Sequence, residues 1–250
     1  MPRPCGKSVD ELGRWRCCGG GERLGTCRIL SRGSDAFRDR AEAAEMLARE
    51  LSLFADRRPV VLGIPRGGVV VARVLAKELG GDLDIVLSHK LGAPHNPELA
   101  IGSVSEDGKV FLDERLAAFT GAGTRYIDRE KARQLDLIAE RVERYRKVRP
   151  KVPLEGRVAI VADDGVATGA TMKAALWSAR LEKPATLVAA IPVGPEETVA
   201  ELANLADEVV CLEAPPGFAA VGEFYRLFEQ VDDEEVVAML KNEFARQGGR

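Results

Sequence analysis

The sequence predicts an α/β fold in which an open, twisted, parallel sheet carries helices on both faces. Apolar strands and amphipathic helices alternate along the chain, which is the pattern of a parallel sheet. The candidate strands are apolar without interruption, as in "RVAIVA" (157–162) and "ATLVAAIPV" (185–193), and strands buried on both faces have this composition. The length of 250 residues suits one such domain or two small ones.

The first half of the chain begins its periodic pattern near residue 37. Phe37, Ala44, Leu47 and Leu51 recur at helical spacing. A glycine turn then leads from an apolar strand into a second helix. In order, we expect a helix over 37–52, a strand over 59–65, a helix over 66–80, a strand over 83–90, a loop over 91–100 and a hairpin over 101–113 with its turn at Asp107-Gly108.

The second half opens with a long amphipathic helix over 124–147. Ile127, Leu135, Ile138, Val142 and Tyr145 form its apolar stripe, and its charges are interpreted as a solvated face. The remaining elements follow at regular spacing. We expect a strand over 157–162, a helix over 169–181, a strand over 185–193, a helix over 195–204, a strand over 208–212 and at least one helix within 217–247.

Composition excludes some classes of function. A net charge of −3 argues against nucleic-acid binding, which usually needs a basic patch or stripe. We also expect no membrane partner, because no apolar run approaches the roughly 20 residues that span a bilayer. A cytoplasmic location is the default expectation.

Residues 1–34 are rich in Gly, Arg and Cys and show no apolar period. Four of the five cysteines lie here, but the adjacent Cys17-Cys18 pair has no partner pair at zinc-ligand spacing, and no signal-peptide core supports a disulfide framework. We interpret 1–34 as a disordered or mis-assigned extension and 35–250 as the domain.

The segment "VAIVADDGVATGAT" (158–171) places Asp163 and Asp164 at the end of a buried strand. Ligands of open parallel sheets bind at the carboxyl ends of strands. The glycine- and threonine-rich turn that follows leads into a helix, whose first amides suit a phosphate. Together these features favour a phosphorylated sugar, with its phosphate in the turn and its hydroxyls on the carboxylates. An ordinary helix N-cap would explain one Asp and one Thr.

Two other phosphate-binding motifs do not match this segment. A nucleoside-triphosphate P-loop needs G-x-x-x-x-G-K-[ST], whereas the spacing of Gly165 and Gly169 is wrong and no such lysine follows. The dinucleotide fingerprint G-x-G-x-x-G is also missing.

The segment resembles the phosphoribosyl-diphosphate (PRPP) signature of the type I phosphoribosyltransferases. The resemblance is specific over 158–171. A weaker similarity to one uncharacterised bacterial branch of this family extends over about 37–245, through "GIPRGG", "HKLGAPHNPELAIG" and "AVGEFYRLFEQVDDEEV". Residues 1–36 have no counterpart in that pattern.

The resemblance implies roles for individual residues. Asp163 and Asp164 would bind the ribose hydroxyls, and they form, with Lys90, the expected catalytic set. Arg66, Gly67 and Lys90 would bind pyrophosphate, and His89 is an open candidate for the same role. The expected 5-phosphate turn consists of Ala167, Thr168, Gly169, Ala170 and Thr171.

The resemblance also implies two mobile parts. Segment 91–112 would form a flexible loop or hairpin that closes over the reacting centre, and its His95, Asn96 and Glu98 would face either substrate or solvent. A hood over the acceptor would be built from 37–58, from the tail around Phe218, Phe224 and Tyr225, or from both. Family members are commonly dimers, so a homodimer is an expectation.

The implied reaction is transfer of the ribose 5-phosphate of PRPP to a nitrogen acceptor, with release of pyrophosphate and a role in nucleoside and nucleotide metabolism. Mg²⁺ would be held mainly by PRPP, with no direct protein ligand. Members that act on 6-oxopurines usually carry Asp where this chain has Ala167, so we expect a different nucleobase. A PRPP-binding regulator without turnover, or a hydrolytic or phosphorolytic enzyme using the same site, are the alternatives.

Overall fold

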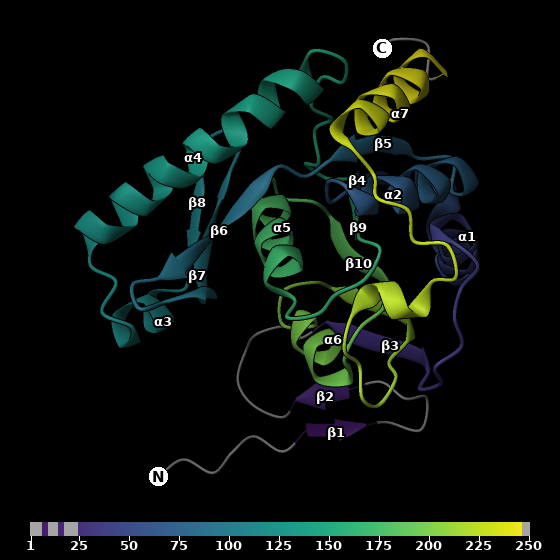
Figure 1. Ribbon diagram of the computed structural model, residues 1–250, viewed down its shortest axis with the longest axis horizontal. Helices are drawn as coiled ribbons and strands as arrows, with labels where there is room; N and C mark the ends of the chain where they lie inside the picture. Colours follow the sequence, from purple (N-terminus) through teal and green to yellow (C-terminus); the bar gives the residue numbers. More distant parts are fainter. Residues whose placement is uncertain (1–6, 10–14, 18–24, 247–250) are drawn as a thin grey trace.

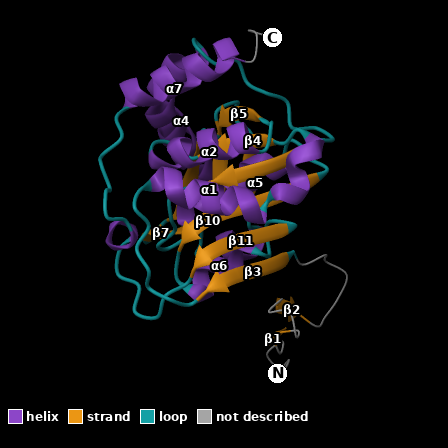
Figure 2. Ribbon diagram, turned by 90° about the vertical axis from the view of Figure 1, so that its right-hand side faces the viewer, coloured by secondary structure: helices purple, strands orange, loops and turns teal. Residues whose placement is uncertain are grey.

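A six-stranded parallel sheet forms the centre of the molecule (Figures 1 and 2). The computed structural model of the chain describes residues 7–9, 15–17 and 25–246. Every neighbouring pair of strands in this sheet runs parallel, which confirms the predicted fold class. In spatial order the strands are β3 (Thr26–Ser31), β11 (Glu208–Glu213), β10 (Thr186–Val193), β9 (Val158–Ala162), β4 (Val60–Gly63) and β5 (Asp82–Ile85).

Helices cover both faces of the sheet because alternate strand residues point to opposite sides. In β9, Val158, Ile160 and Ala162 face one core, and Ala159 and Val161 face the other. The first core lies under α1 (Arg40–Glu50), α2 (Gly67–Glu78) and α7 (Asp233–Arg246). The second lies under α5 (Ala170–Arg180) and α6 (Glu196–Leu202). Short 3-10 helices occupy Ser52–Arg57 and Val221–Phe224.

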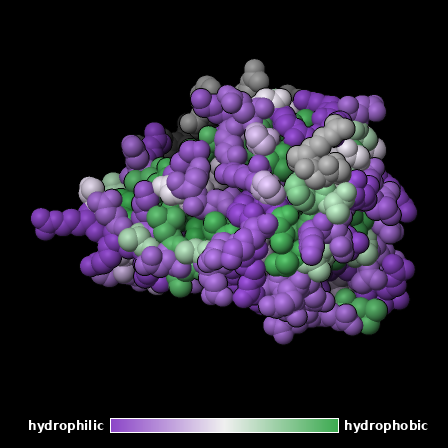
Figure 3. Space-filling view, turned by 90° about the horizontal axis from the view of Figure 1, so that it is seen from above, coloured by the Kyte–Doolittle hydropathy of each residue, from purple (hydrophilic) through white to green (hydrophobic). Residues whose placement is uncertain are grey.

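A second, smaller unit projects from the carboxyl edge of the sheet, and we call residues 88–146 the lobe. It contains a three-stranded antiparallel sheet with its own core. Its elements are β6 (Ser88–Ala93), β7 (Asn96–Ser105), β8 (Val110–Leu112), α3 (Glu114–Phe119) and α4 (Thr124–Arg146). Figure 3 shows that the side of the molecule carrying α4 and α7 is largely hydrophilic. The solvated face expected for α4 holds for most of its charges but not for Arg146, whose side chain is 15% exposed and ion-paired.

The lobe corrects two expectations. The strand expected over 83–90 is divided into β5 and β6, which belong to different sheets. The loop expected over 91–100 instead pairs β6 with β7, through an irregular register around Gly92. This pairing joins segments with few apolar residues, so periodicity did not show it. The turn at Asp107-Gly108 is confirmed, with Gly108 at a φ of 75°.

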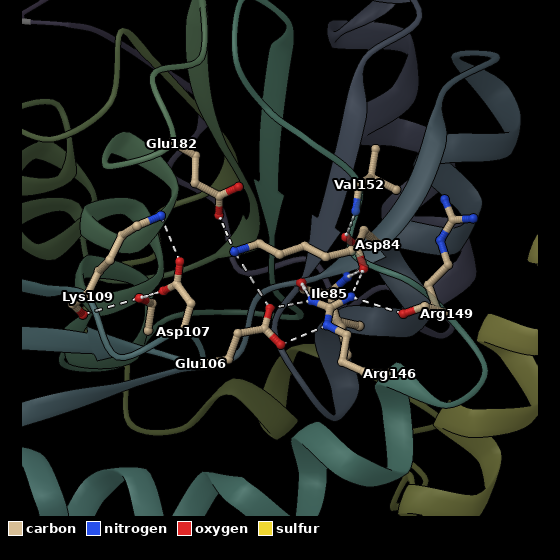
Figure 4. A network of polar contacts seen from close by, with 11 residues as sticks. Asp84, Ile85, Glu106, Asp107, Lys109, Arg146, Arg149, Val152 and Glu182 are labelled. Carbon is tan, nitrogen blue, oxygen red and sulfur yellow. Dashed lines mark hydrogen bonds and ion pairs between the residues drawn. The ribbon is translucent and has the colours of Figure 1, made fainter. Parts of the chain in front are cut away.

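A network of charges fastens the lobe to the sheet (Figure 4). The Arg146 guanidinium, at the end of α4, bonds Asp84 Oδ1 of β5 at 2.6 Å. It also makes two bonds of 2.7 Å to the Glu106 carboxylate in the hairpin turn. The second Asp84 oxygen accepts from the Val152 amide at 2.8 Å, and Lys151 pairs with Glu182 at 2.9 Å. These contacts hold the two ends of the lobe at one place on the sheet.

An aromatic contact joins the lobe to α5. Phe111 of β8 stacks on Trp177 of α5, with ring centroids 4.8 Å apart and an interplanar angle of 16°. Trp177 is buried, so this contact excludes water from the junction between the lobe and the sheet.

The amino-terminal segment corrects a further expectation. We expected 1–34 to lack structure, but Thr26–Ser31 forms the edge strand β3 and pairs with β11. Arg28 interrupts the apolar pattern there, and its guanidinium bonds Glu50 and Glu208 at the sheet edge. Lys7–Val9 and Trp15–Cys17 pair as β1 and β2. The remaining residues of the predicted extension, 1–6, 10–14 and 18–24, lie outside the described part of the chain.

Within the described residues, no helix has both the length and the apolar character needed to cross a membrane.

Candidate functional site

The predicted acid pair lies directly after the central strand β9. Asp163 Oδ1 accepts a 2.9 Å hydrogen bond from the Asp164 amide, and both side chains are half-buried. The next strand of the sheet, β4, ends in register with β9, with Gly63 opposite Ala162. The loops that follow β4 and β9 therefore start side by side at the carboxyl edge. We call these two loops, 64–68 and 163–171, the strand-end loops.

The two strand-end loops are in close contact. A Cβ added to Gly67 would lie 2.0 Å from Asp164 Oδ2, and one added to Gly68 would lie 2.9 Å from Asp163 Oδ1. Only residues without a Cβ fit at this separation. The Pro65–Arg66 peptide bond just before these glycines is cis. The structure thus brings the predicted pyrophosphate loop against the predicted ribose-binding pair.

Arg40 is a member of the site that the sequence did not indicate. Its Nε lies 2.7 Å from Asp164 Oδ2, and Nη1 donates to the Glu229 carbonyl at 2.8 Å. The guanidinium carbon lies 3.9 Å from the centroid of the Phe228 ring, an arrangement typical of a cation–π contact. Arg40 is buried, so this charge compensates an Asp164 carboxylate that is largely removed from water.

The protonation of the pair is set by its surroundings. Burial, followed by the negative charge of Asp164, raises the pKa of Asp163 well above its ordinary value, and the charge of Arg40 acts in the opposite direction. The pair consequently binds a proton more readily than two exposed carboxylates do. Such a pair can both accept hydrogen bonds from sugar hydroxyls and donate one to them.

The loop after the acid pair turns sharply into α5. Gly165 has no room for a side chain, since a Cβ would lie 2.5 Å from Val221 Cγ1. Gly169 has a φ of 72°, in the left-handed region, and is the residue from which α5 begins. Ala167, Thr168 and Thr171 are exposed. The first amides of α5 have no partner within the helix, so the predicted phosphate turn offers amide donors at a helix N-terminus.

A cavity of about 360 Å³ lies beside the strand-end loops. Its wall includes Pro65, Lys90 and Thr171, one residue each from the predicted pyrophosphate loop, the following strand and the predicted phosphate turn. The wall does not include Asp163 or Asp164. The Lys90 ammonium pairs with Glu98 Oε2 at 2.8 Å, and Glu98 is largely exposed.

The two chain segments predicted for a hood meet beside Asp164. Phe37 forms an isolated parallel bridge with Tyr225, and their ring centroids are 5.5 Å apart. The Tyr225 hydroxyl donates to the Asp164 carbonyl at 2.6 Å. Burial and the nearby Asp164 charge raise the pKa of Tyr225, so its hydroxyl remains a donor at neutral pH. Phe218 stacks on Phe224 with centroids 5.5 Å apart.

The predicted closing loop, 91–112, lies within the three-stranded antiparallel sheet of β6, β7 and β8. His95 and Asn96 are exposed at its first turn and do not line the cavity, and the Asn96 side chain accepts from the Glu98 amide. Their placement gives no support for substrate contact in this conformation.

The carboxylates of the acid pair can bind a cation only together with other ligands. Among the described residues, no cluster of three or more His, Cys, Asp or Glu side chains could hold a metal ion. Asp163 and Asp164 offer two carboxylates, and Arg40 already engages one oxygen of Asp164. Mg²⁺ is commonly held by one or two carboxylates together with water and substrate phosphates. The site therefore fits an Mg²⁺ that a phosphorylated substrate brings with it.

Comparisons with known proteins agree with this geometry. The family model described as "Phosphoribosyl transferase domain" matches residues 34–223. Two curated proteins of Mycobacterium tuberculosis, from strains CDC 1551 / Oshkosh and ATCC 25618 / H37Rv, are provisionally named phosphoribosyl transferases. Each is 45% identical over 215 residues, which is 85% of this chain and 48% of the relative. The chain thus spans about half the length of these relatives.

A solved structure supports the same fold. The crystal structure of TT1426 from Thermus thermophilus is 49% identical to this chain and has a TM-score of 0.79. The match covers 83% of this chain and 98% of TT1426.

Proposed function

The chain belongs to the phosphoribosyltransferase family, and from this premise we propose that it transfers the ribose 5-phosphate of PRPP to a nitrogen atom of a nucleobase and releases pyrophosphate. The observation that carries the proposal is the contact between the two strand-end loops. Gly67 and Gly68 lie against Asp163 and Asp164, and the phosphate turn starts directly after this pair. One molecule with a diphosphate, a sugar diol and a terminal phosphate would meet all three parts.

In this proposal the acid pair holds the ribose. The Asp163 and Asp164 carboxylates accept hydrogen bonds from the two ring hydroxyls, and Arg40 holds the Asp164 carboxylate in place. The terminal phosphate accepts hydrogen bonds from the backbone amides of Ala167 to Thr171 at the start of α5. Because these donors belong to a turn fixed by Gly165 and Gly169, the sugar is oriented before any bond changes.

The bond that breaks joins the sugar C1 to a pyrophosphate oxygen. The electron pair leaves with pyrophosphate, positive charge develops on the sugar ring, and the nitrogen lone pair of the acceptor forms the new bond to C1. The chain supplies no nucleophile. Arg66, Lys90 and the loop amides around Gly67 stabilise the leaving anion. Mg²⁺ bound with PRPP would face Asp163 and Asp164 and neutralise part of the diphosphate charge.

The acceptor is proposed to be a nucleobase other than a 6-oxopurine. Ala167 is exposed next to the phosphate turn and has only a methyl group, so it cannot act as a base toward a purine ring nitrogen. In this proposal the aromatic side chains of the terminal segments, among them Phe218 and Tyr225, form the hood that covers the acceptor ring.

A binding experiment tests the site. Calorimetry with PRPP and Mg²⁺ should give binding to the wild type and none to the double variant Asp163→Asn plus Asp164→Asn. A matched control, Asp56→Asn plus Asp136→Asn, removes the same charge from exposed positions and should bind as the wild type does. Unchanged affinity in the first variant would remove the site assignment.

An activity experiment tests the reaction. A panel of nucleobases is incubated with PRPP, Mg²⁺ and the full chain, and pyrophosphate release is measured. We expect one base to stimulate release and 6-oxopurines to be inactive. If PRPP binds but no base stimulates release, the PRPP-binding regulator is the better description.

A further inference from the structure

The cavity beside the strand-end loops has one wall that the proposed function does not use. This wall belongs to α4, which contributes Gln134, Ile138 and Arg141. The opposite walls carry Lys90, from β6, and Thr171, from the phosphate turn. A helix of the lobe therefore faces the groups assigned to pyrophosphate and to the 5-phosphate across a volume of about 360 Å³.

Arg141 is a half-buried cation in this wall. Within the part of the chain that the structure describes, no acceptor bonds its guanidinium and no carboxylate pairs with it. Its charge instead acts on His89 and on Tyr145, and the charge of Arg66 acts on Tyr145 as well. Lys90 of β6 and Arg141 of α4 thus bring two positive charges to the cavity wall, and Glu98 pairs with the first of them. A half-buried guanidinium that no acceptor or carboxylate engages is stabilised when an anion joins it.

His89 adds a group whose charge can change. Gln134 Nε2 donates to Glu130 Oε1 at 2.7 Å, which turns the Gln134 carbonyl oxygen toward His89. This oxygen can only accept, so the hydrogen on the neutral ring lies on Nδ1, 2.9 Å away. The remaining nitrogen, Nε2, is an acceptor when the ring is neutral and a donor when it is protonated. No partner for Nε2 occurs among the described residues.

We propose that this cavity receives the diphosphate group of the substrate and the pyrophosphate product, that Arg141 of α4 is a binding residue for it alongside Lys90, and that His89 takes up a proton when the diphosphate enters. The proposal rests on the proposed function for the identity of the anion. It assigns the lobe a direct role in holding the leaving group.

The protonation state of His89 in the free protein determines how the affinity for pyrophosphate depends on pH. Burial lowers the pKa of His89 below its ordinary 6.5, the hydrogen bond with Gln134 acts in the opposite direction, and the charges of Arg141 and Arg133 lower the pKa further, so the free ring is mainly neutral at pH 7. A bound anion favours the imidazolium and raises this pKa. Affinity for pyrophosphate therefore strengthens as pH falls through the His89 pKa of the complex, and it levels off below the pKa of the free protein.

The charged groups around His89 are few. On its own strand it has Lys90, which pairs with Glu98 of β7. The α4 helix contributes Glu130, Arg133 and Arg141. The α5 residues in the cavity wall, Thr171, Ala174 and Ala175, carry no charge.

Calorimetry with inorganic pyrophosphate and the full chain tests the part of Arg141. Arg141→Gln should raise the dissociation constant by about tenfold or more, because charge-assisted hydrogen bonds to a phosphate are lost. The matched control Arg144→Gln lies one turn along α4, where it pairs with Glu140 and Glu234, and should change the constant by less than about twofold. No binding of pyrophosphate to the wild type, or equal affinity in wild type and Arg141→Gln, would overturn the proposal.

Two His89 variants test the proton. His89→Asn keeps a polar group near the Nδ1 position, whereas His89→Gln places an amide donor near the Nε2 position. Titrations in two buffers of different ionisation enthalpy give the number of protons taken up near pH 7. Pyrophosphate itself takes up the same number of protons in all three proteins. Relative to either variant, the wild type should take up an additional fraction of a proton that approaches one. His89→Gln should retain more affinity than His89→Asn near pH 8. Proton uptake equal in all three proteins contradicts the role of His89.

The outcomes separate this inference from the proposed function. If Arg141 and His89 control pyrophosphate binding while Asp163→Asn plus Asp164→Asn leaves PRPP affinity unchanged, the cavity assignment stands and the sugar assignment fails. If the acid pair controls PRPP binding but Arg141→Gln has no effect on pyrophosphate binding, the sugar assignment stands and the cavity assignment fails.

Discussion

The strand-end loops and the lobe meet the same cavity with different chemistry. The loops contribute Ile64, Pro65 and Thr171 to its wall, and they continue directly from buried strands of the central sheet. The lobe offers long charged side chains, such as Lys90 and Arg141, on a small antiparallel sheet and a helix. Backbone donors in a short loop between a buried strand and a helix reorient little, whereas long side chains can change rotamer. The molecule thus combines a rigid half with an adjustable half.

This difference indicates which groups of the site fix the position of the sugar and which adjust to the diphosphate. The sugar and its phosphate meet groups whose positions depend on the core of the sheet. Besides Arg66 and Gly67, the proposed diphosphate site includes Lys90 and Arg141, whose positions depend on how the lobe is fastened to Asp84. Substitutions in the two regions should consequently differ in how they change the free energy of unfolding and the affinity for ligand.

The largest expected effect is on stability, at the fastening of the lobe. Arg146→Met leaves Asp84, which is 1% exposed, without its cation. Removing one partner of a buried ion pair costs about 3–5 kcal/mol of unfolding free energy. Urea unfolding followed by circular dichroism measures the change. The control Arg144→Met breaks pairs with the largely exposed Glu140 and Glu234 and a longer pair of 3.8 Å with Asp233, and it should cost no more than about 1 kcal/mol. Equal costs would show that the network is not what holds the lobe.

The next effect is on sugar binding, in the rigid region. Gly67→Ala places a methyl group 2.0 Å from Asp164 Oδ2, so the carboxylate must move from Arg40 and from the ribose position. We expect PRPP affinity to fall by about 10- to 100-fold, in the range found for displaced binding groups. Gly123→Ala, at a glycine with open space around it, is the control. Wild-type affinity in Gly67→Ala would mean that the acid pair is not held by this contact.

The smallest effect is at the adjustable side. Lys90 pairs with Glu98, whose side chain is 78% exposed, so this pair contributes little and competes with a diphosphate for the ammonium. Glu98→Gln should tighten pyrophosphate binding by up to about fivefold, and less at high salt. Calorimetry at two salt concentrations checks this, with the exposed Glu140→Gln as control. Weaker binding in Glu98→Gln would indicate that Glu98 orients Lys90 for the anion.

The sequence predicts the sheet and the acid pair well because both are local patterns. Continuous apolar strands, and a motif contained within 158–171, need no knowledge of distant contacts. The contacts that complete the site are remote along the chain. Arg40 reaches Asp164 across 124 residues, and Gln134 reaches His89 across 45. No periodicity indicates such pairs.

The missed strands share a physical cause. β3 includes Arg28, and the paired part of β7 begins with exposed residues from Asn96 to Leu99. β3 is an edge strand, and the first part of β7 pairs only with β6, so these segments are stabilised by backbone pairing with one neighbour and their side chains need not be apolar. A polar composition therefore favoured disorder or a loop where the chain forms strands.

The stacking of Trp177 on Phe111 gives the molecule an optical reporter. One ring belongs to the helix that starts at the phosphate turn, and the other belongs to the lobe. Any ligand that draws these two bodies together or apart alters the environment of the indole. Fluorescence of Trp177, recorded in a Trp15→Phe background, would then follow lobe movement in solution without an added label.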